Sequence, residues 1–145
     1  MKSLRKFLPV LLAFIAMGCT HNDGDIGPWF GSWAMPAMTV DGDTPPGFDP
    51  VATVWEFHSE VVRIGLLDDH HDFAATAWGT WREADGRLYL DFTHGNGEYT
   101  APSWLLMHPG KVLDLSIVER ENRRMVLRYI TPKGESVVYT LKKTW

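Results

Sequence analysis

The chain has 145 residues, of which 45% are hydrophobic, so it is long enough for one domain with a buried core. Its formal net charge is −4, which argues against nucleic acid as a partner, because nucleic-acid binding needs clustered lysine and arginine. A single cysteine excludes an internal disulfide, so burial alone must hold the fold.

The chain begins with a segment typical of exported proteins. Basic residues in the first six positions precede an uncharged apolar run, Phe7–Met17. A helix that spans a bilayer needs about 20 apolar residues, so this run is too short to span but suits a signal peptide. Ala16-Met17-Gly18-Cys19 resembles a bacterial lipobox, in which the cysteine is lipidated and becomes the first mature residue. The resemblance predicts lipidation at Cys19; an ordinary signal peptide beside a free thiol is the alternative.

This interpretation divides the chain into a lipoprotein signal peptide (1–18), a lipidated cysteine with a polar tether (19–27) and a folded domain (28–145). Cleavage leaves 11 basic and 18 acidic residues, a formal net charge of −7. Such a charge also argues against an electrostatic hold on anionic lipids, so the lipid alone attaches the protein to the membrane. Thr20 follows the cysteine, whereas lipoproteins retained in the inner membrane commonly carry Asp there. We therefore expect the outer membrane, on its periplasmic or surface face.

After the tether the chain is predicted to be all-β, because turn-forming residues separate segments in which apolar and polar residues alternate. The eight predicted strands are Ser32–Val40, Val51–His58, Val61–Asp68, Phe73–Glu83, Arg87–Thr93, Val112–Glu119, Arg124–Ile130 and Ser136–Lys143. Ser103–Met107, in the least regular stretch, is expected to form a short extra strand or a helical turn.

The apolar residues of most predicted strands share one face; for example, Leu113 and Leu115 alternate with polar residues. The sequence leaves open which face of the predicted strand Phe73–Glu83 points inward, because Ala77 and Trp78 are neighbours and lie on opposite faces. An even number of strands joined by hairpins can close into an up-and-down barrel, but a two-sheet sandwich has the same periodicity.

Gly31-Ser32-Trp33 resembles the G-x-W opening of the lipocalin-like barrels. The order of VWEF, VVRI, GTW, GRLYLDF and YTLKKTW is similar to that in lipocalin-like (calycin-type) lipoproteins of Bacteroidetes, from about Gly31 to Trp145. The resemblance implies an eight-stranded antiparallel up-and-down β-barrel. It also implies that Gly31 and Trp33 close one end of the barrel, with Lys142 or Lys143 against Trp33.

An eight-stranded barrel either fills with side chains or holds one small ligand. Nine residues with inward parity are the candidate lining for a small hydrophobic or amphipathic ligand: Trp55, Phe57, Ile64, Leu90, Phe92, Leu115, Leu127, Tyr129 and Tyr139. The alternative is an interior filled by these bulky side chains. The protein would then be a cell-envelope interaction module that binds a protein or glycan through its outer surface. In that case Trp29, Trp78 and Trp104 are candidates for a stacking platform.

No set of residues in the sequence points to catalysis. Asp68-Asp69-His70-His71-Asp72 combines carboxylates and imidazoles, but neighbours on a strand point to opposite faces, so we expect a solvated hairpin tip. His58 and His108 have no recognisable nucleophile or base as a partner. The sequence contains no G-x-S-x-G, H-E-x-x-H or phosphate-loop motif. We expect no enzymatic activity, no cofactor and no metal site.

Overall fold

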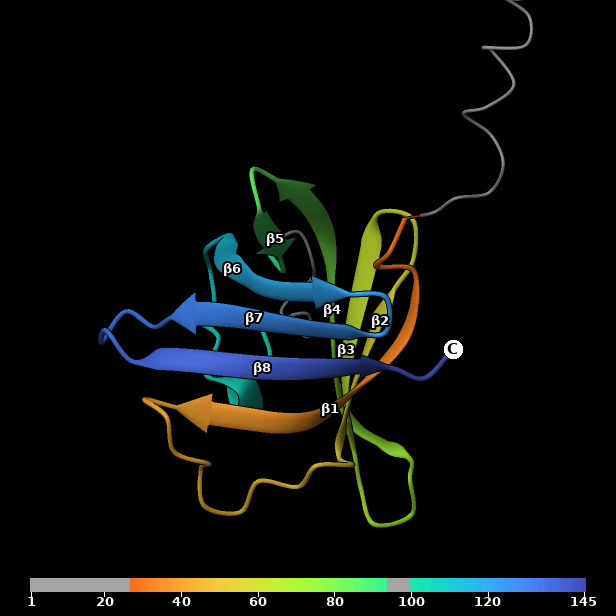
Figure 1. Cartoon of the computed structure of the whole chain (residues 1–145). Coiled ribbons are helices and arrows are strands. Elements are labelled where there is room, and N and C mark those ends of the chain that lie inside the picture. The colour runs from red at the N-terminus through yellow and green to blue at the C-terminus, as the bar shows by residue number, and fades with distance from the viewer. Residues whose placement is uncertain (1–26, 94–99) are drawn as a thin grey trace, which may run out of the picture.

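The computed structural model describes residues 27–93 and 100–145, which form eight strands and one short 3-10 helix (Figure 1). The elements are β1 (Gly31–Val40), β2 (Thr53–Phe57), β3 (Val61–Leu67), β4 (Phe73–Ala84), β5 (Arg87–Asp91), η1 (Ser103–Leu105), β6 (Leu113–Glu121), β7 (Arg124–Ile130) and β8 (Ser136–Lys143). The predicted signal peptide and Cys19 lie outside the described residues.

The eight strands form one closed antiparallel barrel. Each strand pairs with the next along the chain, and β8 pairs back onto β1, from Val40 opposite Val137 to Trp33 opposite Lys143. This closure confirms the predicted up-and-down barrel and excludes the two-sheet sandwich. In the described part of the chain, no helix is long and apolar enough to cross a bilayer.

The predicted strand boundaries agree with the structure to within two residues, and those of β7 and β8 are identical. β2 begins two residues later than predicted, because Asp49 Oδ1 accepts a hydrogen bond from the Val51 backbone N–H and forms a turn there. β5 ends two residues earlier for the same reason, since Asp91 Oδ1 accepts from the Thr93 N–H. Ser103–Met107 contains the helical turn η1 and not an extra strand.

The direction of β4 follows from its small residues. Ala77 is buried, whereas Trp78 is 38% exposed, so the alanine and glycine face of this strand points into the barrel. A Cβ atom on Gly79 would lie 2.5 Å from the Asp91 carbonyl oxygen and 2.7 Å from Phe92 Cδ1. Small side chains on β4 therefore make room for the large side chains of the core.

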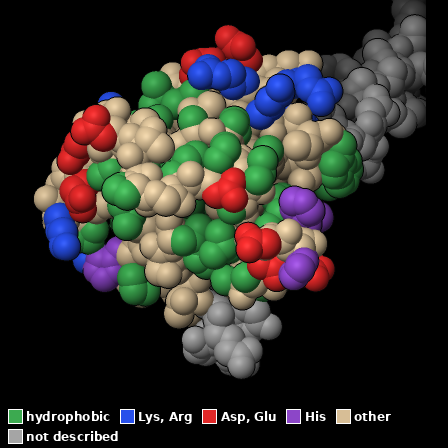
Figure 2. All heavy atoms as spheres, turned by 90° about the horizontal axis from the view of Figure 1, so that it is seen from below, with side chains coloured by type: hydrophobic (Ala, Val, Ile, Leu, Met, Phe, Trp, Pro, Cys, Tyr) green, Lys and Arg blue, Asp and Glu red, His purple; other side chains and the backbone are tan. Residues whose placement is uncertain are grey.

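The barrel has two different ends. The N-terminal turn, the end of β8 and the β2–β3, β4–β5 and β6–β7 hairpins meet at the closed end. The β1–β2 loop, the β3–β4 loop, η1 and the β7–β8 turn surround the opposite end, which we call the mouth. Figure 2 views the molecule from the side of the first two of these loops and shows hydrophobic side chains gathered near the middle of this face.

The barrel has a core of its own. One buried hydrophobic cluster takes side chains from all eight strands and from η1, running from Trp33 on β1 to Leu141 on β8. A chain that starts at Thr20 keeps every one of these elements, so such a soluble fragment should fold without the signal peptide or the lipid.

Candidate binding sites

The nine residues predicted to line the barrel all lie inside it. Seven of them have no exposed area, and Phe92 and Tyr129 keep only 4% and 6%. Their rings pack against one another, since the Trp55 ring centroid lies 6.2 Å from that of Phe57 and 5.6 Å from that of Tyr139. Side chains thus fill the part of the interior that these residues occupy. Whether they contact a ligand stays a prediction, and the rims and walls of the barrel are the more accessible places.

Buried polar groups in the core are unequally satisfied. The Tyr139 hydroxyl donates to the Leu105 carbonyl oxygen at 2.5 Å, and burial raises the pKa of Tyr139 above its ordinary value. In contrast, Nε1 of Trp55 and Nε1 of Trp104 are buried with no acceptor in the described part of the protein. An unpaired buried N–H costs free energy, so an acceptor on a ligand or a water would stabilise either site.

Gly31 and Trp33 lie at the closed end, where the resemblance places them. Trp33 is fully buried, and its Nε1 donates to the Trp29 carbonyl oxygen at 2.8 Å. Lys143 Nζ lies 5.4 Å from the centroid of the Trp33 ring, so Lys143 is the basic residue of the last strand that covers this ring. Gly31 has a φ of 121°, and a Cβ atom there would collide with the Trp145 carbonyl oxygen.

Trp29 also belongs to the closed end and is buried, so it is not a stacking platform. Its Nε1 donates to Glu83 Oε2 at 2.6 Å, and the Arg120 guanidinium lies 5.2 Å from the centroid of a Trp29 ring while pairing with Glu83. Burial raises the pKa of Glu83, but the hydrogen bonds from Trp29 and Arg120 outweigh this effect, so the pKa lies below its ordinary value. Trp29 precedes β1, so strand parity could not predict its burial.

The mouth contains a small pocket with a volume of about 130 Å³. Its apolar walls come from β1, the β1–β2 loop, β3 and the η1 region: Met35, Met38, Phe48, Leu66, Trp104 and Leu105. Leu106, directly after η1, has a φ of 61°, in the left-handed region where a bulky residue is strained. Sites for drug-sized ligands usually measure about 300–1,000 Å³, so this pocket suits a small ligand or one end of a longer one.

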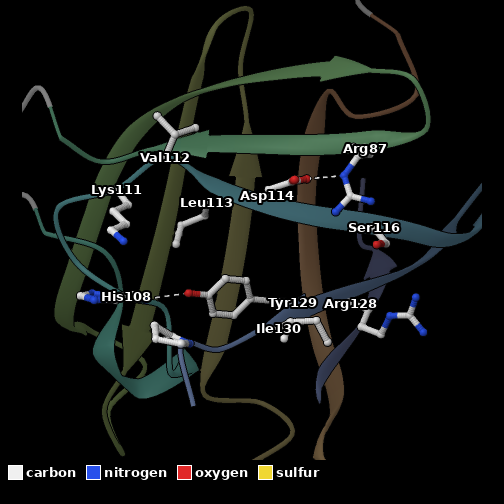
Figure 3. A pocket seen from close by; sticks show the side chains of 11 residues that line it. Arg87, His108, Lys111, Val112, Leu113, Asp114, Ser116, Arg128, Tyr129 and Ile130 are labelled. Carbon is white, nitrogen blue, oxygen red and sulfur yellow. Dashed lines mark hydrogen bonds and ion pairs between the residues drawn. The ribbon is translucent and has the colours of Figure 1, made fainter. Parts of the chain in front are cut away.

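A larger groove, of about 370 Å³, opens in the barrel wall where β6 and β7 separate. β6 pairs with β5 as far as Leu113, but its pairing with β7 reaches only to Leu115, opposite Tyr129. Tyr129 lies in the middle of this lateral groove, and its hydroxyl accepts a hydrogen bond from the His108 backbone N–H at 3.3 Å (Figure 3). The groove joins three separate chain segments, and no sequence motif links them.

Comparisons with known proteins identify the fold. No family model and no curated protein matches the chain. The crystal structure of a lipocalin-like protein from Bacteroides uniformis ATCC 8492 matches with a TM-score of 0.60 and 12% identity, over 81% of this chain and 99% of that chain. The fold is lipocalin-like. An uncharacterized protein from Bacteroides eggerthii DSM 20697 matches with a TM-score of 0.56 and 15% identity, over 79% of this chain and 98% of that chain.

Exposed aromatic rings gather on the outer wall of the lipocalin-like barrel. Trp78 on β4 is 38% exposed, and Phe73 at the start of the same strand is 45% exposed. The Arg63 guanidinium lies 5.4 Å from the Trp78 ring centroid and 4.5 Å from that of Phe73. We call these three residues the aromatic patch. A register shift between Leu66 and Leu67 accompanies the outward position of Phe73, so strand alternation does not predict it.

The acidic loop between β3 and β4 is an exposed turn at the mouth of the lipocalin-like barrel. Asp68 Oδ1 accepts hydrogen bonds from the backbone N–H groups of His70 and Asp72, at 2.8 Å and 3.0 Å. Asp68 therefore caps this turn. Among the residues that the structure describes, no group of three or more His, Cys, Asp and Glu side chains could hold a metal ion.

Proposed function

We propose that the chain is a non-enzymatic, lipid-anchored binding protein of the bacterial cell envelope. It takes up a small hydrophobic or amphipathic ligand at the mouth of its lipocalin-like barrel. The observation that supports this most directly is the apolar pocket at the mouth, whose lining includes Trp104, an indole with no acceptor for its N–H among the described residues. The anchor and the outer-membrane location rest on the signal sequence and on Cys19.

The chemistry of the mouth favours an apolar ligand that carries one hydrogen-bond acceptor. Met35 and Met38 supply flexible, polarisable walls that adapt to irregular shapes. Trp104 adds a rigid aromatic surface to the lining, and its buried Nε1 has no acceptor among the described residues, so a ligand oxygen that reached this atom would satisfy it. The filled interior supports a ligand at the mouth and not one between the Trp55 and Tyr139 rings.

The test uses the soluble fragment from Thr20 to Trp145 and N-phenyl-1-naphthylamine, a neutral dye that fluoresces in apolar surroundings. Ala52, a half-buried pocket residue, is replaced by Trp to fill the mouth. We expect Ala52→Trp to weaken dye binding about tenfold or more, a loss of about 1.4 kcal/mol. Ala84→Trp, a matched change of a half-buried alanine at the other end of the barrel, should leave binding unchanged. Equal binding by all three proteins would refute a mouth site.

The aromatic patch supports a second candidate function, the binding of a glycan on the outer wall. Exposed aromatic rings stack on the apolar faces of sugars, and the Arg63 guanidinium between Phe73 and Trp78 adds hydrogen-bond donors. Arg63 also pairs with Glu56, which holds the guanidinium in place across the sheet.

A glycan array probed with the soluble fragment tests this second candidate. Trp78→Ala should abolish any glycan signal, because it removes one of the two aromatic rings on which a sugar would stack. Trp145→Ala is the matched control, since Trp145 is 66% exposed and lies outside the patch. A glycan signal that survives Trp78→Ala, or the absence of any glycan signal, would exclude the patch as a glycan site.

A further inference from the structure

The lateral groove concentrates positive charge on an acidic protein. Arg87, Lys111 and Arg128 line it, and Asp114 is the one acidic residue among its lining side chains. The whole chain has a formal net charge of −4, so a groove with this excess of cations departs from the average surface. A local positive potential of this kind attracts anions and raises their rate of association.

Two of these cations have no acidic partner among the residues that the structure describes. Asp114 Oδ1 pairs with Arg87 Nε at 2.5 Å, and this hydrogen bond raises the pKa of Arg87. Lys111 and Arg128 make no ion pair within residues 27–93 and 100–145, although acidic residues outnumber basic ones in the chain. Their charges are therefore available to a ligand.

The groove also offers apolar surface and a hydroxyl donor. Leu113 and Tyr129 are buried at its base, while Val112 and Ile130 are 49% and 53% exposed along its sides. The Tyr129 hydroxyl accepts the His108 N–H and donates to no acceptor within residues 27–93 and 100–145, so its proton can be donated to an incoming oxygen. The volume of about 370 Å³ lies within the usual range for small-molecule sites.

We propose that the lateral groove binds a small amphipathic anion, a carboxylate or phosphate group carried on a short apolar body. Figure 3 shows Lys111 and the Tyr129 hydroxyl at one end of the groove, and Arg128 at the other. The anionic group is held by the Lys111 ammonium and the Tyr129 O–H, because hydrogen bonds to a charged group are the stronger ones. The apolar body lies over Leu113 and Ile130. This site is independent of the neutral ligand proposed for the mouth.

The test is an NMR titration of the ¹⁵N-labelled fragment from Thr20 with octyl phosphate and with octanoate, below their micellar concentrations. Octyl glucoside serves as the neutral control. We expect the anions to shift the amide signals of Leu113 and Tyr129, and added salt to weaken their binding. Lys111→Gln should weaken anion binding about fivefold, the upper value for an exposed charge pair. Lys142→Gln, which removes an exposed lysine outside the groove, should leave the affinity unchanged.

Several outcomes would overturn the proposal. Equal shifts with octyl glucoside would mean that apolar contact alone drives binding. Equal losses in Lys111→Gln and Lys142→Gln would mean that only net charge matters, and an unchanged ¹⁵N spectrum of each free variant ensures that folding is not the cause. Sedimentation with phosphatidylglycerol vesicles but not with phosphatidylcholine vesicles, without groove shifts from the two small anions, would identify a lipid surface as the anion instead. Dye binding at the mouth is measured separately. If anion binding fails while the dye still binds, only the groove proposal is refuted and the proposed function stands.

Discussion

Tyr139 joins the last strand of the barrel to the segment that covers its mouth. Its hydroxyl is buried and donates to the Leu105 carbonyl oxygen, and Leu105 is itself 1% exposed. A single hydrogen bond of this kind contributes about 1 kcal/mol to the unfolding free energy. Leaving the carbonyl oxygen unpaired in the core would cost at least about 1 kcal/mol more. The residue therefore stabilises the barrel and also sets the position of one wall of the mouth pocket.

The raised pKa of Tyr139 predicts a loss of stability at alkaline pH. In the unfolded chain the phenol ionises near its ordinary value of 10.0, whereas burial keeps it protonated in the folded protein. The contribution of Tyr139 to the unfolding free energy is therefore complete below about pH 10. Above pH 10 it falls by about 1.4 kcal/mol per pH unit. We expect the difference in unfolding free energy between wild type and Tyr139→Phe, measured in urea, to be constant up to about pH 9 and to decline above pH 10. A difference that does not change with pH would contradict the buried, protonated phenol.

Gly31 allows a second prediction at the scale of the residue. Gly31→Ala combines a strained backbone with a collision against the Trp145 carbonyl oxygen, and should cost about 2–4 kcal/mol of unfolding free energy. Gly47→Ala is the control, because Gly47 also has a positive φ but has no atom within 4 Å of the added Cβ. It should cost only about 1–2 kcal/mol. Thermal and urea unfolding measure both variants. If Gly31→Ala and Gly47→Ala lose the same unfolding free energy, the closed end can shift to accept a side chain.

At the scale of the element, alternation predicted the meander well and its irregularities poorly. β7 and β8 have the predicted bounds because all seven residues of β7 pair with β8 without a register shift, and the inward-facing residues of both strands are buried. Alternation does not predict the outward ring of Phe73, because a register shift interrupts the strand pairing beside it. The lateral groove was missed because it depends on where β6 stops pairing with β7, and no local pattern encodes that point.

The η1 segment supplies a prediction of its own. Leu106 adopts a φ of 61° and is 41% exposed, so its side chain contributes little burial to offset the strain. Leu106→Gly should be more stable than Leu106→Ala by about 1 kcal/mol, because both remove the side chain but only glycine relieves the left-handed backbone. Urea unfolding of the two variants measures this difference. A more stable alanine variant would mean that residue 106 is not left-handed in solution.

For the whole molecule, the motif order around Gly31 and Trp33 predicted the closed lipocalin-like barrel, and the two Bacteroides structures match that fold. Strand alternation shows which residues face inward, but not whether they line a cavity or pack against one another. The sequence therefore leaves open whether the barrel is hollow. The structure packs the predicted lining together and leaves accessible volume at the mouth and in the lateral groove. Binding at the rim and wall therefore fits this molecule better than a deep cavity.

The proposed anchor is also tested on the whole molecule. Expressed in full in a bacterium with two membranes, the wild-type chain should appear in the outer-membrane fraction. Cys19→Ser should abolish metabolic labelling with palmitate and release the protein from that fraction, because no other lipid attachment is proposed. Thr20→Asp should keep the label but shift the protein to the inner membrane. Membrane association that persists in Cys19→Ser without label would contradict a lipid anchor.

A crystal structure of the Thr20–Trp145 fragment with N-phenyl-1-naphthylamine bound would show directly whether the ligand sits at the mouth or inside the barrel. We expect the dye in the mouth pocket against Trp104, with the Trp55 and Tyr139 ring centroids still 5.6 Å apart, as in the free protein. Dye found between those two rings, in a barrel whose core has opened, would contradict a filled interior. It would show that the ligand site lies inside the barrel.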